Sequence, residues 1–181
     1  MHGVIHIELK RYLTKKHGAS AWEAALQEAG LAGRTYDSTH AYPDEETGAL
    51  VCAAAKVASM SRPALLEAFG EFIAPALLAF FPRLIDPAWK TLDLIVNTEG
   101  TIHTVVRTAK AGALPPELKA SRIGPREVQV DYSSRRGMCG LAKGIIKGVA
   151  RHYQEEVEIQ ETQCMSQGAQ SCILMVRIPA S

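Results

Sequence analysis

Three residues that suit anion binding recur at every second position in the run VDYSSRR. Tyr132, Ser134 and Arg136 stand at this spacing, and side chains two positions apart in an extended chain point to the same side. The guanidinium of an arginine matches a carboxylate with two parallel donors, and neighbouring hydroxyls satisfy its remaining lone pairs. The spacing therefore predicts a cluster of donors for an acidic ligand.

This cluster continues an apolar strand face and follows a histidine. Val128 and Val130 share the predicted face of Tyr132, and His103 lies earlier in a short helical pattern. Haem is a flat apolar ring with two propionates, and its iron takes an axial histidine. Together these residues are candidates for a haem site. The plain alternative is that His103 is an ordinary helix residue and the alternation an ordinary strand pattern.

A second group consists of cysteines in the last third of the chain. Cys164 and Cys172 flank a predicted turn, and residues directly opposed across a hairpin have Cβ atoms ~5 Å apart. A shared metal or a disulfide fits that separation. With Cys139 they offer three thiolates that suit tetrahedral zinc, and Glu161 or His152 is the candidate fourth ligand. Buried free thiols and a redox switch are the alternatives.

Helical patterns fill the first part of the chain. Ser20 followed by Glu23 predicts a capping box, and Thr98 is expected to cap the turn that carries His103. Cys52 is expected to be buried as a small apolar residue. The expected helices are residues 2–17, 20–31, 44–60, 61–81 and a shorter piece that begins at Trp89.

The second half of the chain changes to a mixed pattern. Two strands are expected around Gly124-Pro125, and two antiparallel strands joined through Gly168 close the chain. Between these pairs, residues 137–153 predict an amphipathic helix in which glycine recurs at every fourth position. Small residues in a row permit close approach of a neighbouring backbone, of a flat ligand or of the sheet. The fold class is therefore α+β.

Length and charge narrow the classes of function. A chain of 181 residues is long enough for one substantial core, and we expect a single domain. Its 20 Lys and Arg nearly balance 19 Asp and Glu, so we expect no nucleic-acid or membrane partner. We expect no membrane-spanning run and no signal peptide, and hence a cytoplasmic protein.

The combination of motifs resembles a known family. His103, the Leu-Pro-Pro run at residues 114–116 and the Tyr132-x-Ser134-x-Arg136 motif are together similar to the H-NOX family, the haem nitric oxide/oxygen binding domains related to soluble guanylate cyclase. The resemblance covers residues 1–181. It implies an α+β fold with haem b between a helical amino-terminal distal lobe and a carboxy-terminal proximal lobe with a four-stranded antiparallel sheet. The lobes would be about residues 1–62 and 63–181.

The resemblance also implies roles for individual residues. His103 would be the axial ligand of the haem iron, and Tyr132, Ser134 and Arg136 would bind the propionates. Pro116 would press on the porphyrin and hold it out of plane. The residues that would pack on the haem or line the distal pocket are Ile5, Leu9, Ile73, Leu77 and Leu141.

The expected activity is sensing of nitric oxide. Family members that hold dioxygen carry a distal tyrosine where this chain has Leu141, and bound dioxygen gains from such a donor more than nitric oxide does. We therefore expect nitric oxide and CO to bind and dioxygen to be excluded. In the family, nitric oxide weakens the iron bond to the proximal histidine, the haem flattens and the lobes rotate.

The resemblance implies a sensor rather than an enzyme, with its output passed to a histidine kinase or a cyclic-di-GMP enzyme. Two alternative functions belong to other classes of protein. The first is a zinc or thiol redox sensor that uses Cys139, Cys164 and Cys172. The second, a haem peroxidase, is disfavoured because the expected distal pocket has no His or Arg to move protons.

Overall fold

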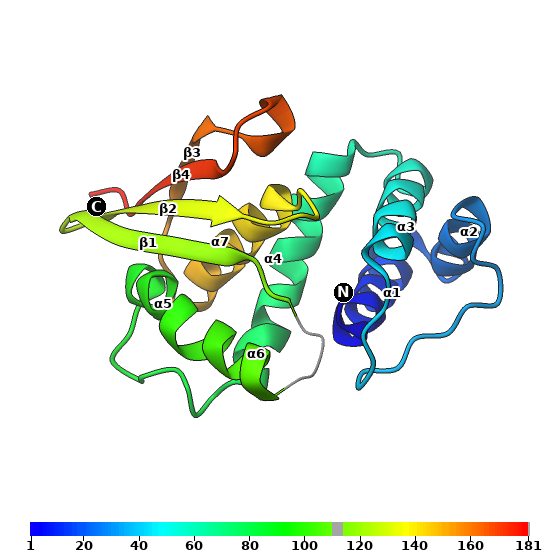
Figure 1. The fold of residues 1–181 in the computed structure, drawn as a ribbon, viewed down its shortest axis with the longest axis horizontal. Coiled ribbons are helices and arrows are strands. Elements are labelled where there is room, and N and C mark those ends of the chain that lie inside the picture. Colours follow the sequence, from blue (N-terminus) through cyan, green and yellow to red (C-terminus); the bar gives the residue numbers. More distant parts are fainter. Residues whose placement is uncertain (110–113, 181) are drawn as a thin grey trace.

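Helices form the amino-terminal part of the molecule, and an antiparallel sheet forms the carboxy-terminal part (Figure 1). This computed structural model describes residues 1–109 and 114–180. The predicted α+β fold class is confirmed. The first helices are α1 (Gly3–His17), α2 (Ala21–Glu28), α3 (Asp44–Val57) and α4 (Arg62–Phe80).

The serines that precede two of these helices differ in whether they cap the helix. Ser61 caps α4 through its hydroxyl, which accepts a hydrogen bond from the Ala64 N–H at 3.3 Å. The predicted capping box at Ser20 is wrong, because that residue has helical backbone angles and makes no side-chain cap bond. The expected burial of Cys52 is also wrong, since α3 turns this side chain outwards.

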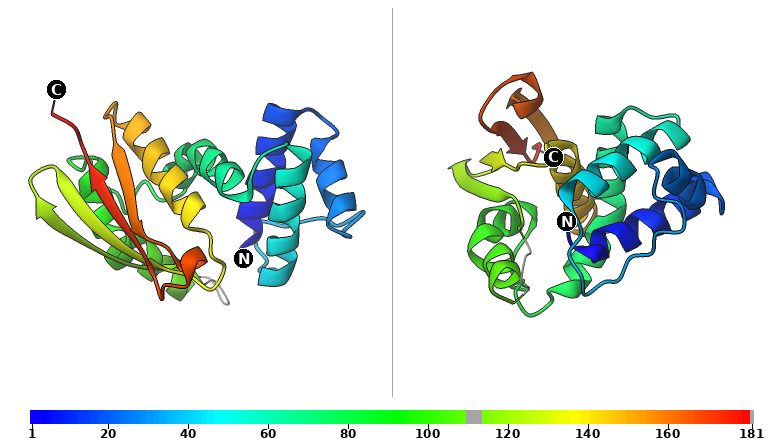
Figure 2. Two further views of the ribbon diagram at one scale, coloured as in Figure 1. Left: turned by 90° about the horizontal axis from the view of Figure 1, so that it is seen from above. Right: turned by 45° about the vertical axis from the view of Figure 1, so that its right-hand side comes forward.

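Helices α1–α3 pack against the first part of α4, and the amino terminus lies at their boundary with the rest of the molecule (Figure 2). Large apolar side chains from all of these helices form the first core. Its fully buried members include Leu13, Leu26, Leu50, Leu65 and Phe69.

Helix α7 (Cys139–His152) crosses α4 at backbone distance. A Cβ atom on Gly144 would run into the backbone carbonyl of Glu67, and one on Gly148 would lie 2.5 Å from the Cβ of Ala74. Lys147 adds an ion pair with Glu67. The glycine repeat thus serves the close approach of a neighbouring backbone, and that neighbour is a helix rather than the sheet or a flat ligand.

Helix α4 corrects one expectation about the sequence. It has 19 residues and is long and apolar enough, by length and composition, to cross a membrane. The apolar composition has an explanation within this fold, because α4 contacts α1 and α3 on one side and α7 on the other. Its acidic residues Glu67 and Glu71 pair with Lys147 and Arg151 of α7.

The sheet has the strand order β1-β2-β4-β3, with every neighbouring pair antiparallel. Helices α5 (Thr91–Asn97) and α7 contribute to the core on one face, to which alternate residues of β2 and β4 point. This alternation confirms the predicted strands. The strands are β1 (Glu117–Gly124), β2 (Glu127–Ser133), β3 (Glu158–Gln163) and β4 (Cys172–Arg177).

Candidate functional site

An apolar cavity of about 450 Å³ lies where α1, the second half of α4, α5, β2 and α7 meet. Phe80 and Leu114 line it and remain 53% and 64% exposed, so the cavity opens to solvent beside them. Its walls are mostly aliphatic. They include Val4, Ile5, Ala74, Leu77, Leu78, Ile102, Val106, Leu141, Ile145 and Val149.

The cavity brings together most of the residues singled out in the sequence. Those in its wall are Ile5, Leu77, His103, Pro116, Tyr132, Ser134, Arg136 and Leu141. Leu9 and Ile73 were expected there as well, but they are 2% and 0% exposed within the first core and do not line the cavity. Helix α4 turns Ile73 into that core, and the next residue, Ala74, takes the position in the cavity wall.

His103 ends a π-helical turn, η1 (Glu99–His103), which lies between α5 and α6 (Thr104–Ala109). Its N–H donates to the Thr98 carbonyl, five residues earlier, at 3.0 Å. The predicted cap at Thr98 is wrong, because this residue has helical backbone angles and its hydroxyl donates to the Leu94 carbonyl at 2.7 Å. Single π-helical turns of this kind are frequent at functional sites.

The His103 ring is fixed by a carboxylate. Its Nδ1 lies 2.9 Å from Oε2 of Glu99. Burial lowers the pKa of His103, although the Glu99 carboxylate opposes this shift. A neutral ring that donates from Nδ1 to Glu99 leaves Nε2 with a lone pair for a metal. Glu99 is not among the site residues expected from the sequence, but its spacing of four residues from His103 is a signal of such a contact in a helix.

The anion-binding residues converge in a different way from the one predicted. Strand β2 ends at Ser133, and Ser134 and Arg136 lie in the turn that follows, where the Arg136 N–H donates to Oγ of Ser134 at 3.3 Å. Simple alternation therefore holds only as far as Tyr132. Burial raises the pKa of Tyr132 to about 12, so its hydroxyl remains a neutral donor.

Arg136 is held from several sides. Its Nε donates to Oδ1 of Asp44 at 2.7 Å, and a terminal nitrogen donates to the Leu114 carbonyl at 2.7 Å. The amino-terminal ammonium of Met1 reaches the same Asp44 oxygen at 2.9 Å. Burial alone would raise the pKa of Asp44, but the two cations outweigh it and lower that pKa. Nothing in the sequence indicated this contact between distant residues.

His2 corrects the expectation that no histidine faces the pocket. It lines the cavity at the start of α1, where its Nδ1 accepts a hydrogen bond from the Val4 N–H at 3.5 Å. This imidazole therefore has a role in capping the helix. Around Leu77 and Leu141 the cavity wall is aliphatic.

The donor set fits haem. One wall carries a neutral imidazole with its Nδ1 already engaged, another carries two hydroxyls and a guanidinium, and the remaining surface is aliphatic. An apolar ring with acidic substituents and a metal centre needs this combination. His103 would supply the ligand, and Tyr132, Ser134 and Arg136 would receive the acidic edge.

Comparisons with known proteins agree with this geometry. A profile of the haem-NO-binding (HNOB) family matches residues 2–161. The chain belongs to this family. Its members are haem-based gas sensors, so the family places a haem-binding domain on nearly the whole chain.

Individual relatives support the assignment. Soluble guanylate cyclase gcy-35 from Caenorhabditis elegans is 26% identical in an alignment 178 residues long that covers 89% of this chain and 25% of that protein. Soluble guanylate cyclase gcy-34 from the same organism is 22% identical in an alignment 156 residues long that covers 83% of this chain and 23% of that protein. The chain thus spans about a quarter of the length of these curated relatives.

Solved structures share the whole fold. The H-NOX protein from S. oneidensis in its Fe(II)NO state has a TM-score of 0.90 and 25% identity, with 99% of this chain and 100% of that chain covered. An unliganded Fe(II) H-NOX protein from K. algicida has a TM-score of 0.88 at 18% identity, with 100% and 98% covered. The second likeness concerns the fold alone.

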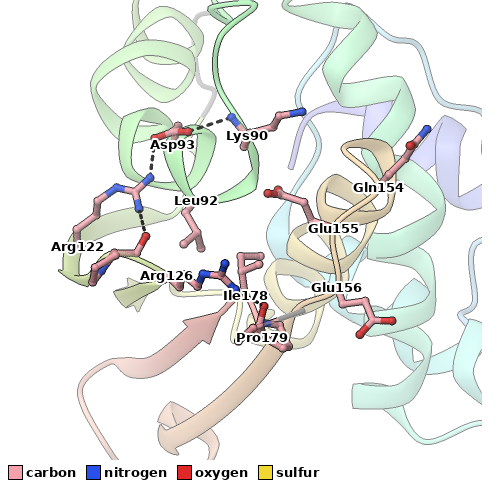
Figure 3. Close-up of a pocket in the computed structure, with 12 residues that line it drawn as sticks. Lys90, Leu92, Asp93, Arg122, Arg126, Gln154, Glu155, Glu156, Ile178 and Pro179 are labelled. Atoms are coloured by element: carbon pink, nitrogen blue, oxygen red, sulfur yellow. Dashed lines mark hydrogen bonds and ion pairs between the residues drawn. The ribbon is translucent and has the colours of Figure 1, made fainter.

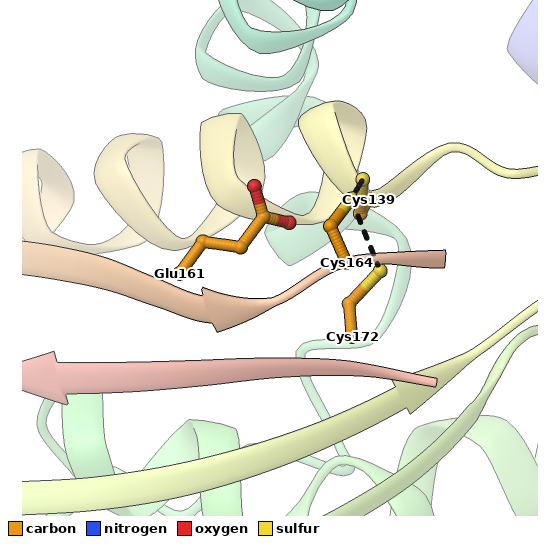
Figure 4. Close-up of side chains that lie close together, drawn as sticks. All are labelled: Cys139, Glu161, Cys164 and Cys172. Atoms are coloured by element: carbon orange, nitrogen blue, oxygen red, sulfur yellow. Dashed lines mark hydrogen bonds between the residues drawn. The ribbon is translucent and has the colours of Figure 1, made fainter. Parts of the chain in front are cut away.

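This H-NOX domain also carries the predicted cysteine group (Figure 4). Ligand atoms of Cys139, Glu161, Cys164 and Cys172 all lie within 4.8 Å of one another. Sγ of Cys164 is 3.7 Å from that of Cys139 and 3.8 Å from that of Cys172, so the thiols are free. His152, the other candidate ligand, is exposed at the end of α7 and does not belong to the group.

The pKa values of the thiols in this group shift in opposite directions. Burial, followed by the neighbouring Cys172, raises the pKa of Cys139 to about 12. For Cys164, burial is outweighed by hydrogen bonds from Ser166, which lower its pKa. Oε2 of Glu161 pairs with Lys143 at 3.1 Å, and its buried Oε1 has no hydrogen-bond partner among the described residues. This buried oxygen is therefore available to a cation.

A second cavity of about 610 Å³ is polar (Figure 3). It lies between the start of α5, the β1–β2 turn and the end of β4. Charged side chains from several segments line it. Arg122 bonds to Asp93 at 2.6 Å, and Arg126 donates to the Pro179 carbonyl at 2.9 Å. Such a surface does not suit an apolar ring.

Proposed function

We propose that this protein is a sensor of nitric oxide that holds haem b in the apolar cavity. The observation that carries the proposal is the wall containing His103. Glu99 fixes its Nδ1 at 2.9 Å, so that Nε2 is left for iron in a cavity that also presents Tyr132, Ser134 and Arg136. Ferrous haem would bind nitric oxide or CO and would hold His103 less firmly once nitric oxide is bound.

The aliphatic distal wall favours nitric oxide over dioxygen. Leu77, Leu141 and Ile145 line the cavity and have no hydrogen-bond donor. This aliphatic part of the wall withholds the donor from which bound dioxygen gains most, and Nδ1 of His2, which also lines the cavity, is engaged as the cap of α1. The reduced protein should therefore form no stable oxy complex in air. A Leu141→Tyr variant, which introduces a donor, should gain one, and a stable oxy complex in the unaltered protein would contradict the proposal.

Signal output would use the contacts between the lobes. We take residues 1–62 as the distal lobe and 63–181 as the proximal lobe, with Pro116 holding the haem distorted. When His103 is released, the turn that carries Arg136 would shift with the haem, and Asp44 of α3 would follow. A histidine kinase or a cyclic-di-GMP enzyme in the cytoplasm would read this movement.

Absorption spectra test this proposal directly. The purified and reduced protein should show a haem spectrum that changes on addition of nitric oxide, and His103→Ala should lose the spectrum of a histidine-ligated haem. His17→Ala is a suitable control, because this imidazole lies at the end of α1 and not in the cavity wall. If the unaltered protein retains no haem after reconstitution, the proposed function is wrong.

A zinc or thiol redox sensor is the second candidate function. The close group of Cys139, Cys164, Cys172 and Glu161 favours it, because three thiolates and a carboxylate suit tetrahedral zinc. Protein purified without chelators should contain about one zinc per chain, and Cys164→Ser should lose it. Cys52→Ser, which removes the exposed cysteine, should keep the metal. Absence of zinc would leave thiol oxidation, which the response of the partner to oxidant would reveal.

A further inference from the structure

The carboxylate of Glu99 receives three donors from three different segments. Oε2 lies 2.9 Å from Nδ1 of His103 and accepts the Leu118 N–H of β1 at 3.1 Å. Oε1 pairs with Arg107 of α6 at 2.6 Å. The contacts from α6 and β1 hold the carboxylate in place, so its bond to His103 has a fixed direction.

A carboxylate at this position changes the donor strength of an imidazole. A histidine that donates its second ring N–H to a carboxylate becomes a more basic ligand, and its ring orientation is fixed. An arginine on the same carboxylate shares the negative charge and weakens this effect. Glu99 and Arg107 therefore act on His103 in opposite directions.

We propose that Glu99 strengthens the bond between His103 and iron, and that Arg107 limits this strengthening. The inference rests on the proposed function, in which His103 is released when nitric oxide binds. Glu99 and Arg107 are positioning residues in this scheme, since they act through His103 and do not line the cavity. The balance between the effects of Glu99 and Arg107 sets the fraction of the nitric oxide complex in which His103 remains bonded to the iron.

The contacts also connect His103 with the sheet. Arg107 donates to the Pro116 carbonyl at 3.4 Å, just before β1, and Leu118 lies in β1 itself. If the imidazole moves away from the iron, the Glu99 carboxylate must move with it or lose its bond to Nδ1. This carboxylate is also hydrogen-bonded to Leu118 of β1. Strand β1 is an edge strand of the sheet, which has the order β1-β2-β4-β3.

Variants with opposite expected effects test the proposal. Glu99→Gln and Glu99→Ala should lower the iron–histidine stretching frequency in resonance Raman spectra of the reduced protein. Arg107→Gln should raise it. Glu99→Ala should also release haem to a scavenging apoprotein roughly 10-fold faster, as other changes to groups behind metal ligands do. General damage to the fold would shift Glu99 and Arg107 variants in the same direction.

Electron paramagnetic resonance supplies a second measurement. Hyperfine splitting from Nε2 of His103 appears only while this nitrogen remains on the iron of the nitric oxide complex. That signal should fall in Glu99→Ala and grow in Arg107→Gln. Glu117→Gln is the matched control, because Glu117 is exposed at the start of β1 and should change neither spectrum.

Nuclear magnetic resonance of the haem-free protein separates this inference from the proposed function. Nitrogen-15 spectra of the His103 ring should show the proton on Nδ1 in the unaltered protein and a mixture of tautomers in Glu99→Ala. Equal stretching frequencies in the Glu99 and Arg107 variants, or a shift of both in one direction, would overturn the inference. Failure to bind haem, with the proton still on Nδ1, would overturn the proposed function and would leave only the fixed orientation of the His103 ring by Glu99.

Discussion

Oδ1 of Asp44, the first residue of α3, lies 2.7 Å from Nε of Arg136, in the turn after β2. The same oxygen receives the amino-terminal ammonium at 2.9 Å. One carboxylate thus joins the amino terminus and α3 to the turn that carries the candidate propionate ligand. A movement of this turn must either carry α3 with it or break a charged hydrogen bond.

Loss of the Asp44 charge should destabilise the fold. Asp44→Asn is expected to lower the free energy of unfolding by roughly 1 to 2 kcal/mol, because hydrogen bonds to charged groups are stronger than neutral ones. Denaturant titration of the haem-free protein measures it. The control is Glu158→Gln, which breaks a pair with Arg177 that is 58% exposed on both sides and should change the free energy of unfolding very little, because solvent screens an exposed pair. An equal loss of unfolding free energy in Asp44→Asn and Glu158→Gln would show that the Asp44 carboxylate stabilises the fold no more than an exposed ion pair does.

His6 should make stability depend on pH. It is 1% exposed, and its Nε2 lies 3.0 Å from Oγ1 of Thr47. Burial, aided by the nearby amino-terminal charge, lowers its pKa from 6.5 to about 4. Between these two pH values the unfolded chain binds a proton that the folded chain does not, so stability is lost as pH falls from 6.5 to 4.

The loss should amount to roughly 3 kcal/mol, at 1.36 kcal/mol for each pKa unit. His6→Gln keeps a donor for Thr47 but does not titrate, so it should lose that much less stability over the same range. Denaturant unfolding of both proteins at several pH values measures the difference. Parallel pH profiles for the two proteins would show that His6 is not the titrating group.

Two glycine substitutions should have opposite signs. Gly144→Ala places a Cβ against the Glu67 carbonyl and should destabilise the protein by about 1 to 3 kcal/mol. Gly48→Ala, within α3, meets nothing within 4 Å and should stabilise it by roughly 0.5 to 1 kcal/mol. Thermal unfolding measures both. A stable Gly144→Ala variant would mean that α4 and α7 separate easily.

Pro116 is expected to keep the haem distorted. It lines the cavity, and its carbonyl accepts from Arg107 at 3.4 Å. Pro116→Ala should weaken the out-of-plane haem bands in resonance Raman spectra, because the rigid ring no longer presses on the porphyrin. Pro179→Ala, in the wall of the polar cavity, is the control. Bands of equal intensity in both variants would contradict this role.

The sequence by itself determined the elements and the main chemistry. Alternation in Val128, Val130 and Tyr132 predicted a strand, and the structure has them in β2 with their side chains buried. Helical spacing predicted α7, and the motifs around His103 and Arg136 indicated the family. Such signals succeed because side-chain period and backbone preference are properties of neighbouring residues.

Tertiary structure decided the details of the site. A turn, and not strand alternation, brings Arg136 to the cavity, and packing turns Leu9 and Ile73 into the first core while His2 enters the cavity wall. Asp44 reaches Arg136 across 92 positions of sequence. Contacts of this kind depend on the angles at which whole elements pack, and local patterns do not encode those angles.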